Sequence, residues 1–112
     1  MSRSTGLRRG RVLRRDRIAG VVEETPTGIR FTYDPAYLAD PQLPPISLTL
    51  PKQTTSHEAP SLFPCFIALL AEGALAELQC RTLRLDENDY LGRVLATCGG
   101  DVIGSLRVEP LP

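Results

Sequence analysis

The chain has 112 residues and a mass of 12.3 kDa, which is enough for one domain with a hydrophobic core of its own. Its composition is 42% hydrophobic and 23% charged, as in ordinary soluble proteins, and no apolar run approaches the roughly 18 residues of a membrane span, so no membrane association is expected. The net charge of zero hides an asymmetry. The first 17 residues hold seven of the thirteen basic residues and one of the thirteen acidic ones, which leaves the remainder acidic.

Residues 1–10 are rich in Arg, Ser and Gly and show no hydrophobic periodicity, which predicts a flexible basic arm ahead of a folded domain at 11–112. No apolar segment of a signal peptide is present, so a cytoplasmic location is expected. Arg8, Arg9 and Arg11 are candidate contacts for nucleic-acid phosphates or for an acidic partner. The alternative is a solvated leader that enters the first strand.

Four predicted strands precede the helices, and one follows them. Short apolar runs at 12–13 and 18–23 predict a hairpin that turns at Arg15-Asp16. Ile29, Phe31 and Tyr33 alternate in a third strand, and residues 46–50 alternate most cleanly, which predicts a fourth strand that ends at Pro51. Residues 102–108 predict the last strand. The residues between 52 and 60 are predicted to form a polar loop, with the single histidine, His57, exposed in it.

The longest apolar run predicts a central helix from Pro64, which is tolerated in a first turn, to Gly73. Residues 74–83 and 88–97 predict two further helices, and one helical turn is predicted at 36–39. The order of the elements indicates a single α+β domain, in which about five strands form a small antiparallel sheet with about three short helices on one side.

Motifs of catalysis are absent from the sequence. Gly99-Gly100 is followed by Asp101 and a predicted strand, whereas a phosphate-binding loop needs a helix and a nearby lysine. One histidine far from any nucleophile does not build a catalytic triad. The three cysteines lack Cys-x-x-Cys spacing and are predicted to be buried free thiols. We therefore expect no enzyme activity, no metal and no cofactor.

Five motifs in order give the chain a resemblance to the N-terminal subdomain of HipA-type serine/threonine kinases, the toxins of HipBA modules. They are the hairpin ending at Gly20; Phe31-Thr-Tyr33 with Tyr37-Leu38; Pro45-Ile-Ser-Leu-Thr-Leu-Pro51; Pro64-x-Phe66-x-x-Leu-Leu-x-Glu-Gly73; and Asp89-x-x-x-x-Val-Leu, through Gly99-Gly-Asp101, to Gly104-x-Leu106. The chain departs from the family pattern at Cys65, where an aromatic residue is common, and at Ala68 and Ala71.

The resemblance implies a role in a toxin–antitoxin module. The sequence lacks the motifs of phosphoryl transfer, so it is similar to HipS, the small antitoxin of HipBST modules. There, HipS neutralises HipT, a kinase without this subdomain. The implied partner is a HipT/HipA-like kinase, and the implied action is non-covalent docking on its N-lobe near the active site. Residues at the start of the predicted central helix are the candidate partner-binding surface: Leu62, Phe63, Pro64, Cys65 and Phe66.

Three alternatives stay open. All five of these residues could belong to the core rather than to a partner surface. The chain could instead be a DNA-associated accessory subunit that uses its basic arm beside a HipB-like repressor at operator DNA. Lastly, it could be a kinase-derived fragment without inhibitory function.

Overall fold

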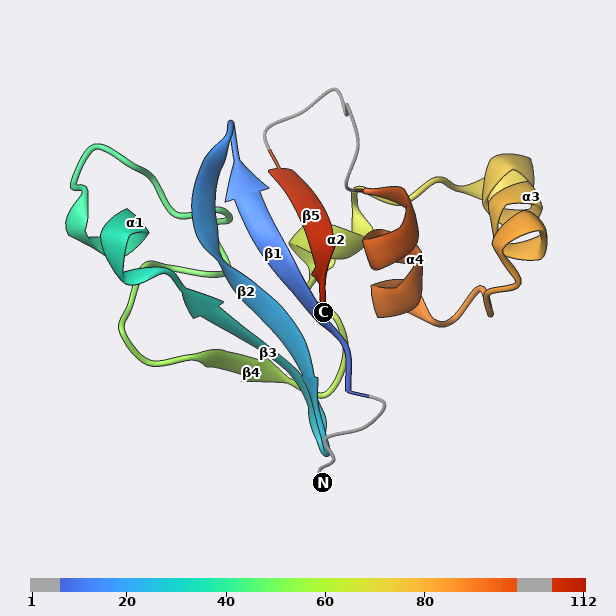
Figure 1. Ribbon diagram of the computed structural model, residues 1–112, viewed down its shortest axis with the longest axis horizontal. Helices are drawn as coiled ribbons and strands as arrows, with labels where there is room; N and C mark the ends of the chain where they lie inside the picture. Colours follow the sequence, from blue (N-terminus) through green and yellow to red (C-terminus); the bar gives the residue numbers. More distant parts are fainter. Residues whose placement is uncertain (1–6, 99–105) are drawn as a thin grey trace.

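The structure is a computed structural model that describes residues 7–98 and 106–112. Its centre is a five-stranded antiparallel sheet, in which the first two strands form a tight hairpin and the last strand pairs with the first. Figure 1 shows the strands side by side in the order β4-β3-β2-β1-β5. Their bounds are Arg9–Arg14 for β1, Arg17–Thr25 for β2, Gly28–Tyr33 for β3, His57–Ala59 for β4 and Leu106–Leu111 for β5.

The first three strands and their turn confirm the prediction from the sequence. The two-residue turn at Arg15-Asp16 joins β1 to β2, with both residues in the left-handed conformation that suits the right-handed twist of the hairpin. Alternate residues of β3, Ile29, Phe31 and Tyr33, are buried on one face of the sheet. This face carries the hydrophobic core of the domain.

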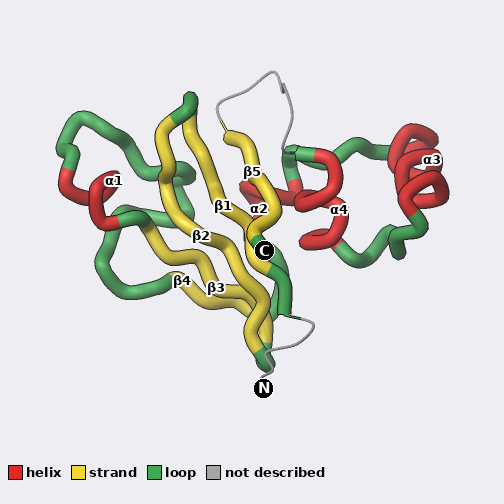
Figure 2. Tube along the Cα trace, viewed as in Figure 1, coloured by secondary structure: helices red, strands yellow, loops and turns green. Residues whose placement is uncertain are grey.

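Four helices accompany the sheet, as Figure 2 shows in red. They are α1, Pro35–Ala39; α2, Pro64–Ile67; α3, Gly73–Leu83; and α4, Tyr90–Thr97. Phe66 of α2 and Val94 of α4 are fully buried in the core cluster, and the ring of Tyr37 in α1 stacks on that of Tyr33 at 5.8 Å. The predicted α+β fold is therefore confirmed. None of the described helices is both long enough and apolar enough to span a membrane.

The predicted strand at 46–50 is wrong. This segment forms a tight turn in which the Leu50 N–H donates to the Ser47 carbonyl at 3.1 Å and the Ser47 hydroxyl accepts from the Thr49 N–H at 3.3 Å. Leu48 consequently projects into solvent and is 97% exposed. The Tyr33 hydroxyl holds the turn by donating to the Leu50 carbonyl.

The fourth strand of the sheet comes instead from the predicted polar loop. β4 pairs with β3 and places Phe31 opposite His57. His57 is half-buried rather than exposed, because its Nε2 lies 2.7 Å from the Pro51 carbonyl oxygen and its ring packs edge-on against Tyr33. Packing against β3 therefore explains this histidine.

The central helix is shorter than predicted. α2 has four residues, and tight i to i+3 hydrogen bonds follow it at Leu69 and Leu70. Gly73 does not close this helix but opens α3, with a positive φ of 61° that a residue with a side chain rarely adopts. The predicted break between the two helices is therefore present near Gly73, but residues 68–72 are not helical.

α3 forms at the predicted residues, but the leucines that mark its helical period face solvent. Ala76 and Cys80 are buried, whereas Leu75 and Leu78 are 55% and 56% exposed. In Figure 1, α3 lies beyond α4, away from the sheet. The predicted helix is therefore present, and Leu75 and Leu78 do not belong to the core.

The C-terminal strand runs past its predicted end. β5 continues through Pro110 to Leu111, and Pro110 is tolerated because β5 is an edge strand. The Val108 N–H donates to the Cys98 carbonyl at 2.9 Å, so part of the outer edge of β5 is covered. Residues 99–105, which include Gly99-Gly100 and the start of the strand predicted at 102–108, lie outside the described residues.

Candidate functional site

The predicted partner-binding segment around α2 divides into buried and exposed side chains. Leu62, Phe63 and Phe66 belong to the core, with exposed fractions of 5%, 7% and 0%. Pro64 is exposed and Cys65 is half-buried. Consequently, only Pro64 and Cys65 of the five residues reach the surface of the domain, while Phe63 and Phe66 anchor the short helix from inside.

Burial raises the pKa of the Cys65 thiol to about 11. The thiol is therefore protonated at neutral pH and is a poor nucleophile. All three cysteines are free, and Cys80 and Cys98 are buried. No group of three metal-ligating side chains occurs within residues 7–98 and 106–112. At the surface of α2, Cys65 thus offers a small apolar side chain.

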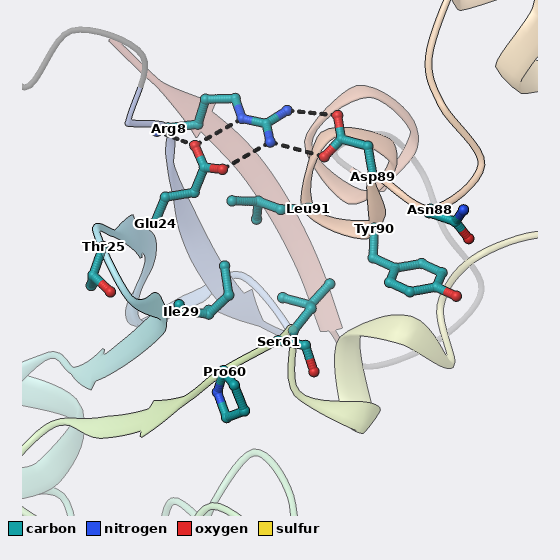
Figure 3. A pocket seen from close by; sticks show the side chains of 12 residues that line it. Arg8, Glu24, Thr25, Ile29, Pro60, Ser61, Asn88, Asp89, Tyr90 and Leu91 are labelled. Atoms are coloured by element: carbon teal, nitrogen blue, oxygen red, sulfur yellow. Dashed lines mark hydrogen bonds and ion pairs between the residues drawn. The ribbon is translucent and has the colours of Figure 1, made fainter.

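Three charged side chains, Arg8, Glu24 and Asp89, form a cluster that we call the arginine clamp (Figure 3). Arg8 Nε and Nη2 donate to the two Glu24 oxygens at 2.9 Å each, and Arg8 Nη1 and Nη2 donate to the two Asp89 oxygens at 2.9 and 2.8 Å. One guanidinium thus forms bidentate pairs with two carboxylates, which is the strongest geometry for such pairs. The clamp ties the residue before β1 to β2 and to the start of α4.

Backbone hydrogen bonds reinforce the clamp. The Arg8 N–H donates to Glu24 Oε1 at 2.8 Å, and the Glu24 N–H donates to the Arg8 carbonyl at 2.9 Å. Asp89 is also the N-cap of α4, because its Oδ1 accepts from the Gly92 N–H at 3.2 Å. Gly92 leaves room for this arrangement, since a Cβ at this position would overlap both Asp89 and Arg8.

The clamp borders a groove of about 280 Å³. As Figure 3 shows, the opposite walls are formed by Ile29 at the start of β3, by Pro60 and Ser61 before α2, and by Tyr90 in the first turn of α4. The polar groups of the clamp are already paired with one another. In the described part of the chain, this groove is therefore a surface depression next to α2, and its polar groups are not arranged as a catalytic site.

The other two predicted nucleic-acid contacts lie in β1 and also have partners within the chain. Arg9 Nη2 donates to the Pro112 carbonyl at 3.3 Å, and Arg11 Nη1 lies 3.7 Å from Glu109 Oε1. β1 begins at Arg9, two residues before the predicted start of the folded domain, and Arg8 is held by the clamp. Residues 1–6 of the predicted arm lie outside the described residues.

Comparison with models of known protein families identifies the family of this chain. Residues 10–109 match the model of the HipA N-terminal domain. The chain belongs to the HipA N-terminal domain family. The resemblance seen in the sequence motifs is thereby confirmed, and the matched stretch begins within β1 and ends within β5.

Two individual proteins are similar to this HipA N-terminal domain over almost its whole length. An uncharacterized protein of Haemophilus influenzae (strain ATCC 51907 / DSM 11121 / KW20 / Rd) is 30% identical over 103 residues, which are 92% of this chain and 92% of that protein. A solved structure described as the N-terminal domain of HipA toxin is 28% identical, with a TM-score of 0.71 over 100% of this chain and 98% of that one. The fold of the whole HipA N-terminal domain is therefore retained.

The arginine clamp was not predicted from the sequence. Arg8 is separated from Asp89 by 81 positions, and the sequence indicates Arg8 only as part of a basic arm. Asp89 did give a local signal, because an aspartate three residues before Gly92 at the start of an apolar stripe is typical of an N-cap. No local pattern connects that cap to Arg8.

We expect the clamp to make the stability of the domain depend on pH. Hydrogen bonds from Arg8 hold the pKa of Glu24 and of Asp89 below their ordinary values, although partial burial opposes this effect. A carboxylate with a lowered pKa in the folded state stabilises the fold above its unfolded pKa, and this contribution disappears as the pH falls through the folded value. The melting temperature should therefore fall as the pH decreases below about 4.5, near the ordinary pKa of glutamate.

A variant with Arg8→Met tests the origin of this dependence. It should melt at a lower temperature than the wild type at pH 7 and show a smaller decrease between pH 7 and acidic pH. The clamp side chains are partly exposed, so solvent screening limits the difference. If the melting temperatures of the two proteins decreased by the same amount across the acidic range, a stabilising role of the clamp would be contradicted.

Proposed function

We propose that this HipA N-terminal domain is an antitoxin that binds and inhibits a HipT/HipA-like serine/threonine kinase. Membership of the family over residues 10–109 carries this proposal. The 112 residues contain the fold described as the N-terminal domain of HipA toxin but no motifs of phosphoryl transfer. A kinase that lacks this domain can receive it from a separate chain, which acts without enzyme activity of its own in the cytoplasm.

The relative from Haemophilus influenzae supports a function in trans. The matching 103 residues are 92% of that protein, so that protein consists almost entirely of the matched region. In a complex of two separate chains, the domain must hold its kinase partner by a non-covalent interface. Such interfaces place a few apolar side chains at their centre and polar groups at their rim.

We place the centre of this interface on the exposed side of α2. Phe63 and Phe66 fix the helix to the core, which presents Pro64, Cys65 and Ala68 to the outside. Here the chain carries Cys65, a protonated thiol at neutral pH, so this position contributes apolar contact rather than charge. Docking on the kinase N-lobe near the active site then obstructs nucleotide or substrate, or holds an inactive arrangement.

The test is co-expression with a HipT-like kinase that lacks this domain. Two single variants, Cys65→Asp and Ala68→Asp, each place a charge on the exposed side of α2, and Ala68 is exposed enough to leave the core undisturbed. Since burial of an unpaired charge at an interface is costly, we expect affinity to fall at least about tenfold and kinase autophosphorylation to return.

Leu83→Asp is the matched control. Leu83 is 45% exposed in the last turn of α3, so this variant introduces the same charge at another surface site and should inhibit like the wild type. Melting curves of all three variants exclude unfolding as the cause of lost inhibition. Retained inhibition by both α2 variants would contradict the proposed surface, and absence of any complex with the wild type would contradict the proposed function.

The DNA-associated accessory role beside a HipB-like repressor stays a prediction. Arg8, Arg9 and Arg11, which motivated it, each have a partner within the chain. Binding of operator DNA through these three residues would require those contacts to be released. The antitoxin proposal needs no such rearrangement.

A further inference from the structure

The tip of the β1–β2 hairpin carries three arginines around one aspartate. We define the hairpin tip as residues Arg14, Arg15, Asp16 and Arg17. It lies at the end of β1 opposite the arginine clamp, where Figure 1 shows the two blue strands meeting at the upper edge of the sheet. The proposed interface on α2 does not use these side chains.

The backbone of the hairpin tip is unfavourable for its sequence. Arg15 and Asp16 have φ angles of 49° and 69°, in the left-handed region where hairpin turns favour Asn and Gly. Asp tolerates this region, but Arg has no local hydrogen bond that compensates for it. Residues in such conformations concentrate at functional sites, which makes the side chain of Arg15 a candidate for a function.

The charges of the hairpin tip are also arranged unfavourably for the isolated domain. Arg14 lies directly opposite Arg17 in the β1–β2 register, and opposed like charges destabilise a strand pair. Arg17 lies 3.5 Å from Asp40, and Asp16 pairs with Arg107 at 3.1 Å. Within residues 7–98 and 106–112, neither Arg14 nor Arg15 has an ion-pair partner. The tip therefore carries an excess of positive charge.

We propose that the hairpin tip binds the phosphate backbone of duplex DNA. Guanidinium groups match the geometry of phosphate oxygens, and Arg14, Arg15 and Arg17 lie together at one end of the sheet, on two adjacent strands and the turn that joins them. Binding of phosphates relieves the repulsion between the two arginines. The four residues of the tip include no aromatic side chain, so stacking on single-stranded bases does not explain them.

This proposal is independent of the antitoxin function. It also uses other residues than the predicted nucleic-acid contacts, since the hairpin tip lies at the opposite end of β1 from Arg8 and Arg9. The hairpin tip and the exposed side of α2 are separate surfaces. One chain can therefore contact a kinase and DNA through different residues.

The test is fluorescence anisotropy of a labelled duplex titrated with the full chain at several salt concentrations. Three phosphate contacts predict a slope of about −2.7 for log K against log[salt]. The triple variant Arg14→Gln, Arg15→Gln, Arg17→Gln should bind at least about tenfold more weakly at about 50 mM salt, with a slope close to zero.

The matched control removes the same charge elsewhere, by Arg30→Gln, Arg81→Gln and Arg84→Gln. It should retain the wild-type affinity within about threefold, since general electrostatics alone is weak. The tip variant should melt at or above the wild-type temperature, which excludes unfolding as the cause. The proposal would be overturned if the two variants lost affinity equally or if the wild type did not bind at about 50 mM salt. It would also be overturned by binding that does not depend on salt, or by a preference for poly-glutamate over the duplex.

Discussion

Replacement of Phe66 by Ala is expected to lower the free energy of unfolding by about 3–5 kcal/mol. The Phe66 side chain is 0% exposed, and its ring packs against Phe31 at a centroid distance of 6.1 Å and against Phe63 at 6.3 Å. Truncation removes these contacts and leaves a cavity between α2 and β3, which the surrounding sheet cannot fill. Chemical denaturation followed by circular dichroism measures the loss.

Leu48→Ala is the control for this experiment. It also shortens a large apolar side chain, but one that is 97% exposed, so the change should stay within about 0.5 kcal/mol. A loss below about 1 kcal/mol for Phe66→Ala would show that Phe66 is not a core residue. In that case, the prediction that the whole segment from Leu62 to Phe66 forms the partner surface would regain its support.

Replacement of Gly92 by Ala is expected to destabilise the domain by about 2 kcal/mol. The new Cβ overlaps the carboxylate of Asp89 and the guanidinium of Arg8, so the clamp must open. Overpacking costs about 1–3 kcal/mol, and a weakened N-cap adds about 1 kcal/mol. The higher helix propensity of Ala offsets about 1 kcal/mol of this sum. Thermal and chemical unfolding at pH 7 give the net value.

A double-mutant cycle with Arg8→Met separates the clamp from the helix itself. If the clamp carries the cost, Gly92→Ala should be much less harmful in the Arg8→Met background, where one of the two overlapping side chains is absent. A gain of about 1 kcal/mol from Gly92→Ala in the wild-type background would mean that helix propensity alone decides the outcome, and that no closed clamp lies against Gly92.

Elements governed by local patterns could be predicted from the sequence. The hairpin, β3 and α4 each combine a clear hydrophobic period with a turn or cap residue. β2, β3 and α4 lie within two residues of their predicted bounds, whereas β1 begins three residues before the predicted run at 12–13. The segment at 46–50 shows where such reasoning fails. Its alternation is as clear as that of β3, yet Ser47 closes a tight turn and Tyr33 binds the Leu50 carbonyl from another element. The competing interaction is tertiary, so no local window contains it.

The candidate site was predictable only in part for the same reason. The sequence indicated the α2 segment correctly as an important apolar stretch, but whether Phe63 or Cys65 faces the core depends on how α2 packs against the sheet, which no local pattern specifies. The arginine clamp depends on the close approach of Arg8, Glu24 and Asp89, three residues that share no periodicity. Both features follow from the assembled fold rather than from the pattern of any one segment.

The two edges of the sheet also determine how the protein behaves at high concentration. An open edge with free N–H and C=O groups invites strands from other molecules and leads to aggregation. Here β4 has only three residues, while β5 carries Pro110, which lacks an N–H, and donates its Val108 N–H to Cys98. Each edge is a poor template for a further strand, so the domain is protected from edge-to-edge polymerisation during synthesis and storage.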